Sequence, residues 1–302
     1  MNCSSPLLAA RLYKPLLGKS VVKILPRRVD QGYEENVSKY GRDNLFFLPC
    51  GHCKACISRR KKEWSIRCCM EAMDHNENCF ITLTYDESNY PGDDTDKLRS
   101  DVHGFIKALR NRGVKYRYFG CCEAGDRSSR YHFHLILFGY MPNDIKFHSK
   151  SKSSLPIYTS KFIESVWNKG IVTVQEFSPF AASYVAGYCL KKMIDCDNSF
   201  HFQSTRPGIG AAYFLRNIEH IYDTDNLILN FGSHIFSVPR YFDKLAESLD
   251  LDLSDIKEAR INKSLLLNYQ AINQSGYANM EDMMFHEAQN AERDWKYRKR
   301  SI

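Results

Sequence analysis

A regular succession of apolar segments between residues 79 and 177 constrains the fold of this chain most strongly. Side chains alternate with the period of a strand in 79–85, 114–122, 131–138 and 171–177, and with the period of a helix in 96–112 and 158–168. The order strand, helix, strand, strand, helix, strand is that of a split βαβ, or ferredoxin-like, arrangement. We therefore predict an α+β fold in which helices cover one face of an antiparallel sheet.

The predicted strand Tyr131–Phe138 carries two histidines on one face. Because Cα atoms two residues apart on a strand are separated by about 6.6 Å, His132 and His134 can both reach one metal ion. Half-buried histidines that only make hydrogen bonds are the alternative, and the pair at this spacing favours the metal. Glu123 precedes a predicted hairpin turn, so it is the candidate third ligand, or else a solvated turn residue.

A predicted helix after Ser178 carries a stripe of tyrosine and lysine. Ser178 suits the N-cap and Pro179 the first helical position. Tyr184 and Tyr188 are neighbours at positions i and i+4, and Lys191 and Lys192 extend the same polar side, opposite an apolar face. A core helix whose tyrosine hydroxyls point outward is the alternative interpretation.

The stripe and the histidines together indicate phosphodiester chemistry. A tyrosine phenol has a pKa near 10, and a neighbouring ammonium favours its ionised form. Attack by the phenolate on a phosphodiester would give a phosphotyrosine and a free 3′-hydroxyl. A metal would polarise the phosphate. Two histidines and one carboxylate suit zinc or iron better than magnesium or manganese, unless the substrate phosphate completes the shell.

The cysteines indicate a second metal site. Cys50, Cys53 and Cys56 form a Cys-x2-Cys-x2-Cys run, a spacing moderately specific for zinc. Cys3 is the preferred fourth ligand and His52 the second choice, and an iron–sulfur cluster is an alternative to zinc. The total of 11 cysteines is odd, and the N-terminus lacks a signal-peptide pattern, which favours reduced thiols in a cytoplasm. No stretch is long enough to span a membrane.

A basic segment follows the cysteines. The chain has a formal charge of +7, and residues 54–67 hold several cations against the single acid Glu63. We expect this helix to contact DNA phosphates, although a solvated basic face is the alternative. The candidate DNA-binding residues are Arg59, Arg60, Lys61, Lys62 and Arg67.

These motifs resemble the rolling-circle replication initiators of the His-hydrophobic-His endonuclease superfamily, in the paired-tyrosine form of the microviruses. The resemblance to the gokushovirus branch covers residues 3–245 and includes 49–56, 64–68, 80–85, 206–210 and 239–241. It departs at Tyr131, where a proline is expected before the first histidine.

The resemblance implies roles for the candidate residues. A magnesium or manganese ion is held by His132, His134 and Glu123, and Tyr188 attacks first. Tyr184 then performs the joining transfer, although the order of the two tyrosines can alternate. Lys191, or alternatively Lys192, assists the transferring oxygens.

The sequence also predicts an organisation along the chain. An arm of residues 1–57, irregular over 1–49, holds the cysteine cluster with structural zinc; the endonuclease core spans 58–200. Residues 201–250 form an accessory region with a helix, a hairpin near 230–233 and a second helix from Pro239. Residues 251–302 form a helical, basic tail. The polar stretch 141–157 is expected to be a loop.

We therefore predict a site-specific endonuclease and ligase that nicks the viral origin and starts and ends rolling-circle replication. Its partners are single-stranded or supercoiled origin DNA and a host helicase and DNA polymerase, in the cytoplasm of a bacterial host, without a membrane. Two rival interpretations stay open: a zinc-stabilised nucleic-acid-binding protein without catalysis, and a metal phosphodiesterase that activates water.

Overall fold

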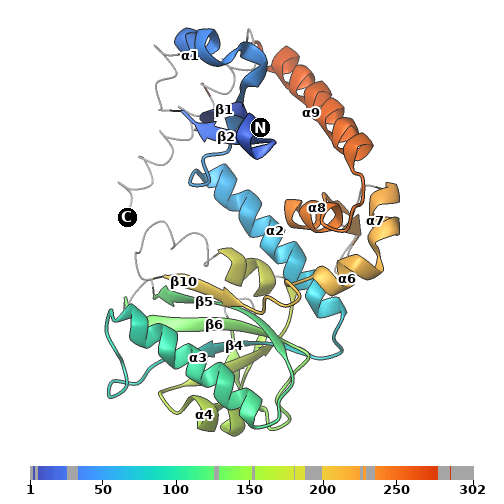
Figure 1. Ribbon diagram of the computed structural model, residues 1–302. Coiled ribbons are helices and arrows are strands. Elements are labelled where there is room, and N and C mark those ends of the chain that lie inside the picture. Colours follow the sequence, from blue (N-terminus) through green and yellow to red (C-terminus); the bar gives the residue numbers. More distant parts are fainter. Residues whose placement is uncertain are drawn as a thin grey trace. The chain divides into compact units, whose positions relative to one another are not determined.

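The computed structural model describes residues 3, 6–25, 33–125, 129–151, 154–179, 181–187, 199–224, 227–228, 235–277 and 286 (Figure 1). The chain divides into two compact units, one of residues 1–59 with 259–302 and one of residues 60–258. Helices α2 (Lys54–Met73) and α9 (Ser254–Ser275) run across the boundaries between them. None of the described helices is both long and apolar enough to cross a membrane.

The first unit contains a small sheet where the sequence predicts an irregular arm. Strands β1 (Leu7–Lys14), β2 (Lys19–Ile24) and β3 (Leu45–Leu48) pair antiparallel in the order β2-β1-β3, and helix α1 spans Tyr33–Tyr40. The prediction for residues 1–49 was therefore wrong. Leu8, Ala10 and Leu25 form the buried cluster of this sheet among the described residues, so its apolar core is small.

The second unit is built on a seven-stranded sheet. Its strands are β4 (Asn78–Leu83), β5 (Arg117–Ala124), β6 (Tyr131–Phe138), β7 (Lys146–Lys150), β8 (Pro156–Thr159), β9 (Val172–Glu176) and β10 (Phe200–Gln203). They lie in the order β10-β5-β6-β4-β9-β8-β7, and the recorded pairs are antiparallel. The expectation of a loop over residues 141–157 was wrong, because β7 and the first half of β8 lie there.

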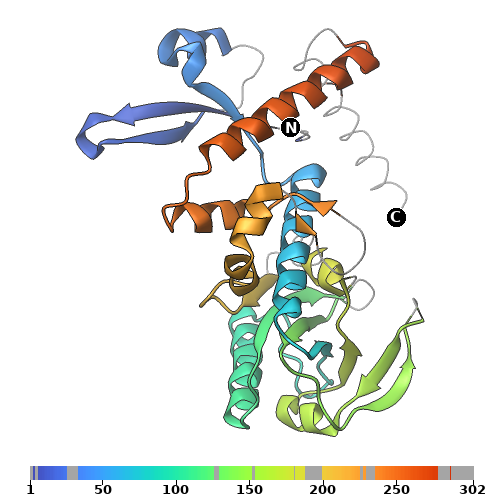
Figure 2. The ribbon, with the colours of Figure 1, turned by 90° about the vertical axis from the view of Figure 1, so that its right-hand side faces the viewer.

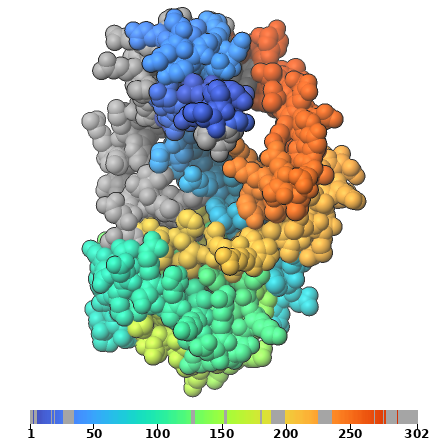
Figure 3. Space-filling model, viewed as in Figure 1, coloured from blue at the N-terminus to red at the C-terminus, as the bar shows by residue number. Residues whose placement is uncertain are grey.

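One face of this sheet packs against helices α3 (Thr95–Asn111) and α4 (Lys161–Trp167). Apolar residues recur along α3 at helical spacing and are buried against Leu83, Phe133 and Trp167. The carboxylate of Asp94 caps α3 by accepting a hydrogen bond of 2.9 Å from the Lys97 N–H. Figure 3 shows the side chains of α3 as a continuous surface over this side of the unit. The opposite face of the sheet is thereby left for the histidines.

The predicted α+β class and antiparallel sheet are confirmed. Within the sheet, β5-β6-β4-β9 are adjacent. Helix α3 connects β4 to β5, which are separated by β6, and the segment that contains β7, β8 and α4 connects β6 to β9, which are separated by β4. This order is compatible with a split βαβ arrangement. Strands β7, β8 and β10 extend the sheet beyond four strands, and the ferredoxin-like assignment itself stays a prediction, as do the domain boundaries.

The accessory region contains helices and a two-stranded antiparallel sheet, and residues 230–233, where the sequence predicts a hairpin, lie outside the described residues. Its elements are α6 (Ala211–Arg216), α7 (Ile218–Thr224), β11 (Leu227–Ile228), β12 (Ile235–Phe236) and α8 (Arg240–Glu247, with Pro239 at its N-cap). Helix α2 anchors it, because buried Glu71 accepts a hydrogen bond of 2.7 Å from the Gly210 N–H and pairs with Arg117.

Arg67 belongs to this anchor and not to an exposed basic face. Its guanidinium lies 4.0 Å from the ring centroid of Trp64 and 3.7 Å from that of Tyr241, and its Nε donates to Ile209 O at 3.0 Å. The side chain is buried. The expectation that Arg67 contacts DNA is corrected accordingly, because its charge is already engaged inside the protein.

Candidate metal and tyrosine site

The β5–β6 hairpin brings the three predicted ligands together. The antiparallel register places Glu123 opposite His132 and Cys121 opposite His134. His132 and His134 share the face of β6 that points away from α3 and α4, because their neighbours Phe133 and Leu135 lie in the helix-covered core. All three candidate ligands therefore reach the same side of the sheet.

The ligand atoms of this triad converge on one point. His132 Nε2 lies 3.1 Å from His134 Nε2, and Glu123 Oε1 lies 3.2 Å from His132 Nε2 and 3.1 Å from His134 Nε2. Adjacent ligands of an octahedral ion bound at about 2.1 Å are separated by about 3 Å. The three atoms are thus close enough together to bind one such ion.

The outer nitrogens of both imidazoles are engaged. His132 Nδ1 lies 3.3 Å from the carbonyl oxygen of Arg130, so it must carry the proton in this hydrogen bond. His134 Nδ1 shares a hydrogen bond of 2.9 Å with the Thr82 hydroxyl. A proton on Nδ1 leaves the Nε2 lone pair for a metal, and such outer contacts are typical of ligating histidines.

The electrostatics of the triad also suit a cation. Burial acts to raise the pKa of Glu123, but the hydrogen bonds and charges of His132 and His134 outweigh it and hold the pKa below its usual value. Glu123 is therefore ionised at neutral pH. Its second oxygen, Oε2, is buried without a hydrogen-bond partner among the described residues. Convergent acceptors around a buried carboxylate fit a bound metal ion.

Tyr184 reaches this triad from the predicted helix. Ser178 Oγ accepts a hydrogen bond of 3.1 Å from the Ala181 N–H, as expected of an N-cap, and residues 181–187 are helical. The Tyr184 ring lies edge-on to His134, with centroids 5.5 Å apart, and to Phe80 at 6.2 Å. Tyr188, Lys191 and Lys192 lie outside the described residues.

The sequence relatives of the chain are phage proteins. The family of replication-associated proteins of the ORF2 type matches residues 78–193, a range that includes the triad and Tyr184. Replication-associated protein VP4 of Bdellovibrio phage phiMH2K is 31% identical over 212 residues, which cover 65% of this chain and 66% of that protein. Replication-associated protein ORF2 of Spiroplasma virus 4 is 28% identical over 267 residues, covering 80% and 83%. The chain belongs to this family of replication-associated proteins.

A third member of the family extends well beyond the matched part. Replication-associated protein ORF4 of Chlamydia phage 1 is 31% identical over 224 residues, which cover 68% of this chain and 54% of that protein. The chain thus spans about half the length of that relative and 66% of the phiMH2K protein. No solved structure matches this replication-associated protein. The predicted resemblance to microvirus initiators is confirmed at the level of family.

Two contacts at the site of this replication-associated protein were not predicted from sequence. The Thr82 hydroxyl shares its hydrogen bond with His134 Nδ1. Lys61 lies against the tyrosine helix, since a Cβ atom built on Gly187 would come 3.0 Å from its Nζ. The pairing of β4 with β6 would have identified Thr82, because it places Thr82 opposite His134 on the same face of the sheet.

The cysteine cluster forms a second candidate metal site in the first unit. The sulfurs of Cys3, Cys50, Cys53 and Cys56 all lie within 4.8 Å of one another, so Cys3 and not His52 completes the group. The Cys3 and Cys53 sulfurs are 3.7 Å apart, close to the edge of about 3.8 Å of a tetrahedron with metal–sulfur bonds of about 2.3 Å. Burial raises the pKa of Cys56 to about 12. The nine cysteines among the described residues are free thiols.

Thr82→Val is expected to weaken binding of Mn²⁺ to the triad by about 10- to 100-fold, the usual effect of removing an outer partner of a ligating histidine. Valine keeps the size of threonine but leaves His134 Nδ1 without its 2.9 Å partner. Calorimetric titration with Mn²⁺ measures the change. Thr84→Val is the matched control, because that hydroxyl donates to the Ile171 carbonyl instead. Equal affinities in the two variants would mean that Thr82 does not orient His134.

Proposed function

We propose that this protein is a DNA nicking and joining enzyme that initiates phage replication by tyrosine transesterification. The observation that carries the proposal is the convergence of Glu123, His132 and His134 at 3.1–3.2 Å, with the Tyr184 ring against His134. A carboxylate, two imidazoles and a tyrosine ring beside one sheet face suit metal-assisted phosphodiester chemistry. The family of phage replication-associated proteins supports a role in replication.

The proposed metal is magnesium or manganese. Glu123 Oε1 and the two Nε2 atoms would hold it, and when bound it supplies Lewis-acid polarisation of the scissile phosphate. Manganese accepts imidazole ligands more readily than magnesium does.

The proposed chemical step exchanges one phosphodiester for another. The phenolate oxygen of a tyrosine attacks the phosphorus, a tyrosine–phosphate bond forms, and the bond from phosphorus to the 3′ oxygen breaks. The 3′ oxygen takes up a proton and becomes a free hydroxyl that can prime synthesis. Tyr188 is the proposed first nucleophile and Tyr184 the second, with Lys191 or Lys192 beside the transferring oxygens.

Two tyrosines permit a complete cycle without release of the DNA. After one round of synthesis, Tyr184 would cut the regenerated origin, and the new 3′-hydroxyl would attack the first phosphotyrosine to close a circle. The energy of each cut bond is kept in the protein linkage, so joining needs no nucleotide cofactor. A host helicase and polymerase would perform the synthesis in the host cytoplasm.

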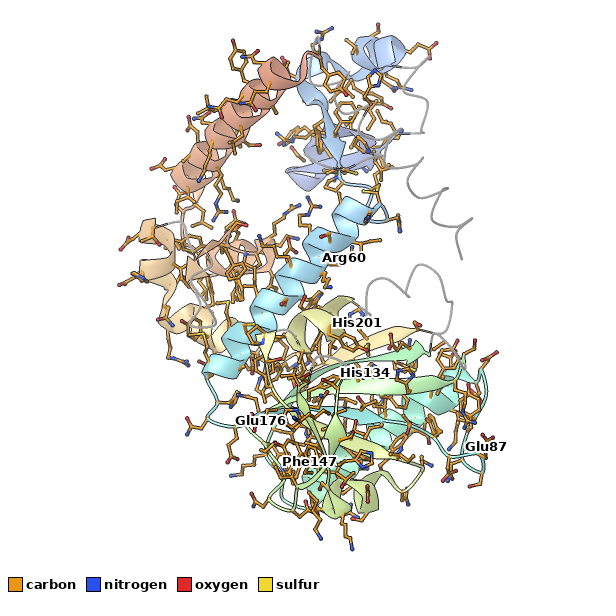
Figure 4. All side chains as sticks on the ribbon, turned by 180° about the vertical axis from the view of Figure 1, so that it is seen from behind. Arg60, Glu87, His134, Phe147, Glu176 and His201 are labelled. Atoms are coloured by element: carbon orange, nitrogen blue, oxygen red, sulfur yellow. The ribbon has the colours of Figure 1, made fainter. Side chains whose placement is uncertain are left out.

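The basic side of α2 is the proposed track for the DNA backbone. Arg59, Arg60 and Lys62 are exposed or half-buried, and Lys61 lies against Gly187 of the tyrosine helix. In Figure 4, Arg60 on α2 and His201 on β10 lie on the same side of the sheet as His134. The strand register also places His201 and His134 on the same face of the sheet. His201 pairs with Cys121, and Cys121 pairs with His134. The structural zinc in the cysteine cluster is a separate, non-catalytic part of the proposal.

A covalent-adduct assay tests this function. Labelled single-stranded oligonucleotides that tile the phage genome are incubated with protein and Mn²⁺, then separated on a denaturing protein gel. We expect an adduct with the strand 3′ of the nick, absent with EDTA and in the Tyr184→Phe/Tyr188→Phe double variant. Tyr118→Phe, which changes a half-buried tyrosine packed on the helix-covered face, is the control and should form the adduct normally.

Different outcomes identify the rival functions. Cleavage without an adduct, in wild type and in the double tyrosine variant alike, would replace the proposal by a water-activating phosphodiesterase. Binding without cleavage on every oligonucleotide would leave a non-catalytic binding protein stabilised by zinc.

A further inference from the structure

The β7–β8 hairpin stands at the end of the seven-stranded sheet. Strand β7 (Lys146–Lys150) is the last in the sheet order, and β8 (Pro156–Thr159) joins β9 at Tyr158, opposite Val174. A bulge between Phe147 and Ser149 shifts the register, which increases the local twist. Figure 2 shows this hairpin projecting from the body of the second unit.

The base of the hairpin is firmly held. Asp144 Oδ1 accepts a hydrogen bond of 2.5 Å from Ser160 Oγ, and Asp144 Oδ2 accepts one of 2.9 Å from the Phe162 N–H. Ser160 is fully buried and also caps α4. One carboxylate thus joins the segment before β7 to the segment after β8. The hairpin is therefore a structured element of the fold and not a polar linker.

The side chains of the hairpin form a basic and aromatic surface. Residues 145–160 contain Lys146, His148, Lys150 and Lys152 and not one Asp or Glu. Lys146, His148 and Lys150 are exposed, and the Phe147 side chain is 62% exposed, with its ring 6.5 Å from that of Tyr158. Lysines follow the phosphates of an unpaired strand while an exposed aromatic ring stacks on its bases.

Two alternative roles for this surface fit its residues less well. Lysines on an end strand commonly serve only to prevent edge-to-edge association, but that purpose does not require an exposed phenylalanine. Pairing of β7 with a strand of another protein is opposed by the same lysines and by the bulge. An acid-free basic surface with an aromatic side chain complements single-stranded DNA best.

We propose that the β7–β8 hairpin, through Lys146, Phe147 and Lys150, is a second contact for single-stranded DNA, outside the metal and tyrosine site. The inference rests on the proposed function, because it takes single-stranded DNA as the substrate. The hairpin lies at the opposite end of the sheet from β10, and β6 with its histidines lies between them.

Fluorescence anisotropy with the full-length protein and a labelled oligonucleotide, in EDTA to prevent cleavage, tests the hairpin. We expect Lys146→Ala/Lys150→Ala to weaken binding and to lower the slope of log K against log salt by about 1.4. Phe147→Ala should weaken binding about 5-fold or more, the lower end of a base–aromatic stack. The control is Lys107→Ala/Lys115→Ala, which removes the same charge from exposed lysines on and just after α3.

The outcomes separate this inference from the proposed function. Hairpin variants that bind as tightly as the control, while wild type forms the covalent adduct, would overturn the hairpin contact alone. Weaker binding by the hairpin variants supports the contact, even if the wild-type protein forms no adduct and transesterification fails. Circular dichroism checks the fold, and because all three side chains are exposed, each variant should fold normally.

Discussion

His134→Ala is expected to lower the rate of covalent-adduct formation by about 1,000-fold or more. The substitution leaves Glu123 and His132 as two ligands, too few to hold a hydrated divalent ion against water. Lewis-acid stabilisation of the phosphate is worth several kcal/mol, and each 1.36 kcal/mol is about tenfold in rate. Single-turnover adduct formation with saturating oligonucleotide in Mn²⁺ measures this effect directly.

Three further measurements make this prediction specific. His103→Ala removes an exposed histidine of α3 and should leave the rate unchanged. Because His134 is buried, thermal unfolding must show that the variant keeps its fold, and Glu123→Gln provides a variant of equal size that removes only the ligand charge. Mn²⁺ binding should fall in His134→Ala and Glu123→Gln. Retention of the rate within tenfold would exclude the triad as the metal site.

The part of the fold around the triad could be predicted from sequence because its signals are local. Tyr131–Phe138 was predicted with its observed bounds, since the run is apolar except for two histidines on one face and Gly139 ends it. Glu123 and His132 are separated only by a hairpin turn, and the register follows once the turn is recognised. The Ser178 cap likewise lies within a few residues of the helix it starts.

Contacts between segments distant in the sequence could not be predicted in the same way. Thr82 meets His134 only because β4 pairs with β6, and a threonine on a strand gives no other signal. Arg67 has the spacing of a basic helix face, but Trp64 and Tyr241 enclose it, and Tyr241 comes from a distant segment. Burial of a charge by a remote ring cannot be inferred from helical period alone.

End strands were missed for a different reason. Residues 146–150 are polar and largely exposed, and this composition resembles a loop, although lysines are common on end strands. The strands of the first unit are short or carry charged residues, and β1 pairs with β3 from beyond α1. These strands form because they pair with other segments, so the spacing of their apolar residues does little to predict them.

Removal of the metal that we propose for the cysteine cluster is expected to unfold the described strands of the first unit. The small apolar cluster of Leu8, Ala10 and Leu25 cannot stabilise a three-stranded sheet by itself. A structural zinc contributes about 10–16 kcal/mol in zinc-finger peptides, more than such a core supplies. Elemental analysis should find one zinc per chain at this site, and hydrogen exchange over residues 7–24 should accelerate at least about 100-fold after chelation.

Cys3→Ser is the sharpest form of this test, because Cys3 is the only ligand of the described group outside the 50–56 run. Cys3 precedes β1, and β1 is the middle strand, paired with both β2 and β3. Loss of this ligand would therefore release the start of the strand that holds the sheet together. Zinc content and exchange protection should fall together. His52→Ala in the same loop is the control, since His52 is exposed and outside the group, and it should change neither. Full protection without any metal would reject the site, and a visible absorbance band with bound iron would replace zinc by an iron–sulfur cluster.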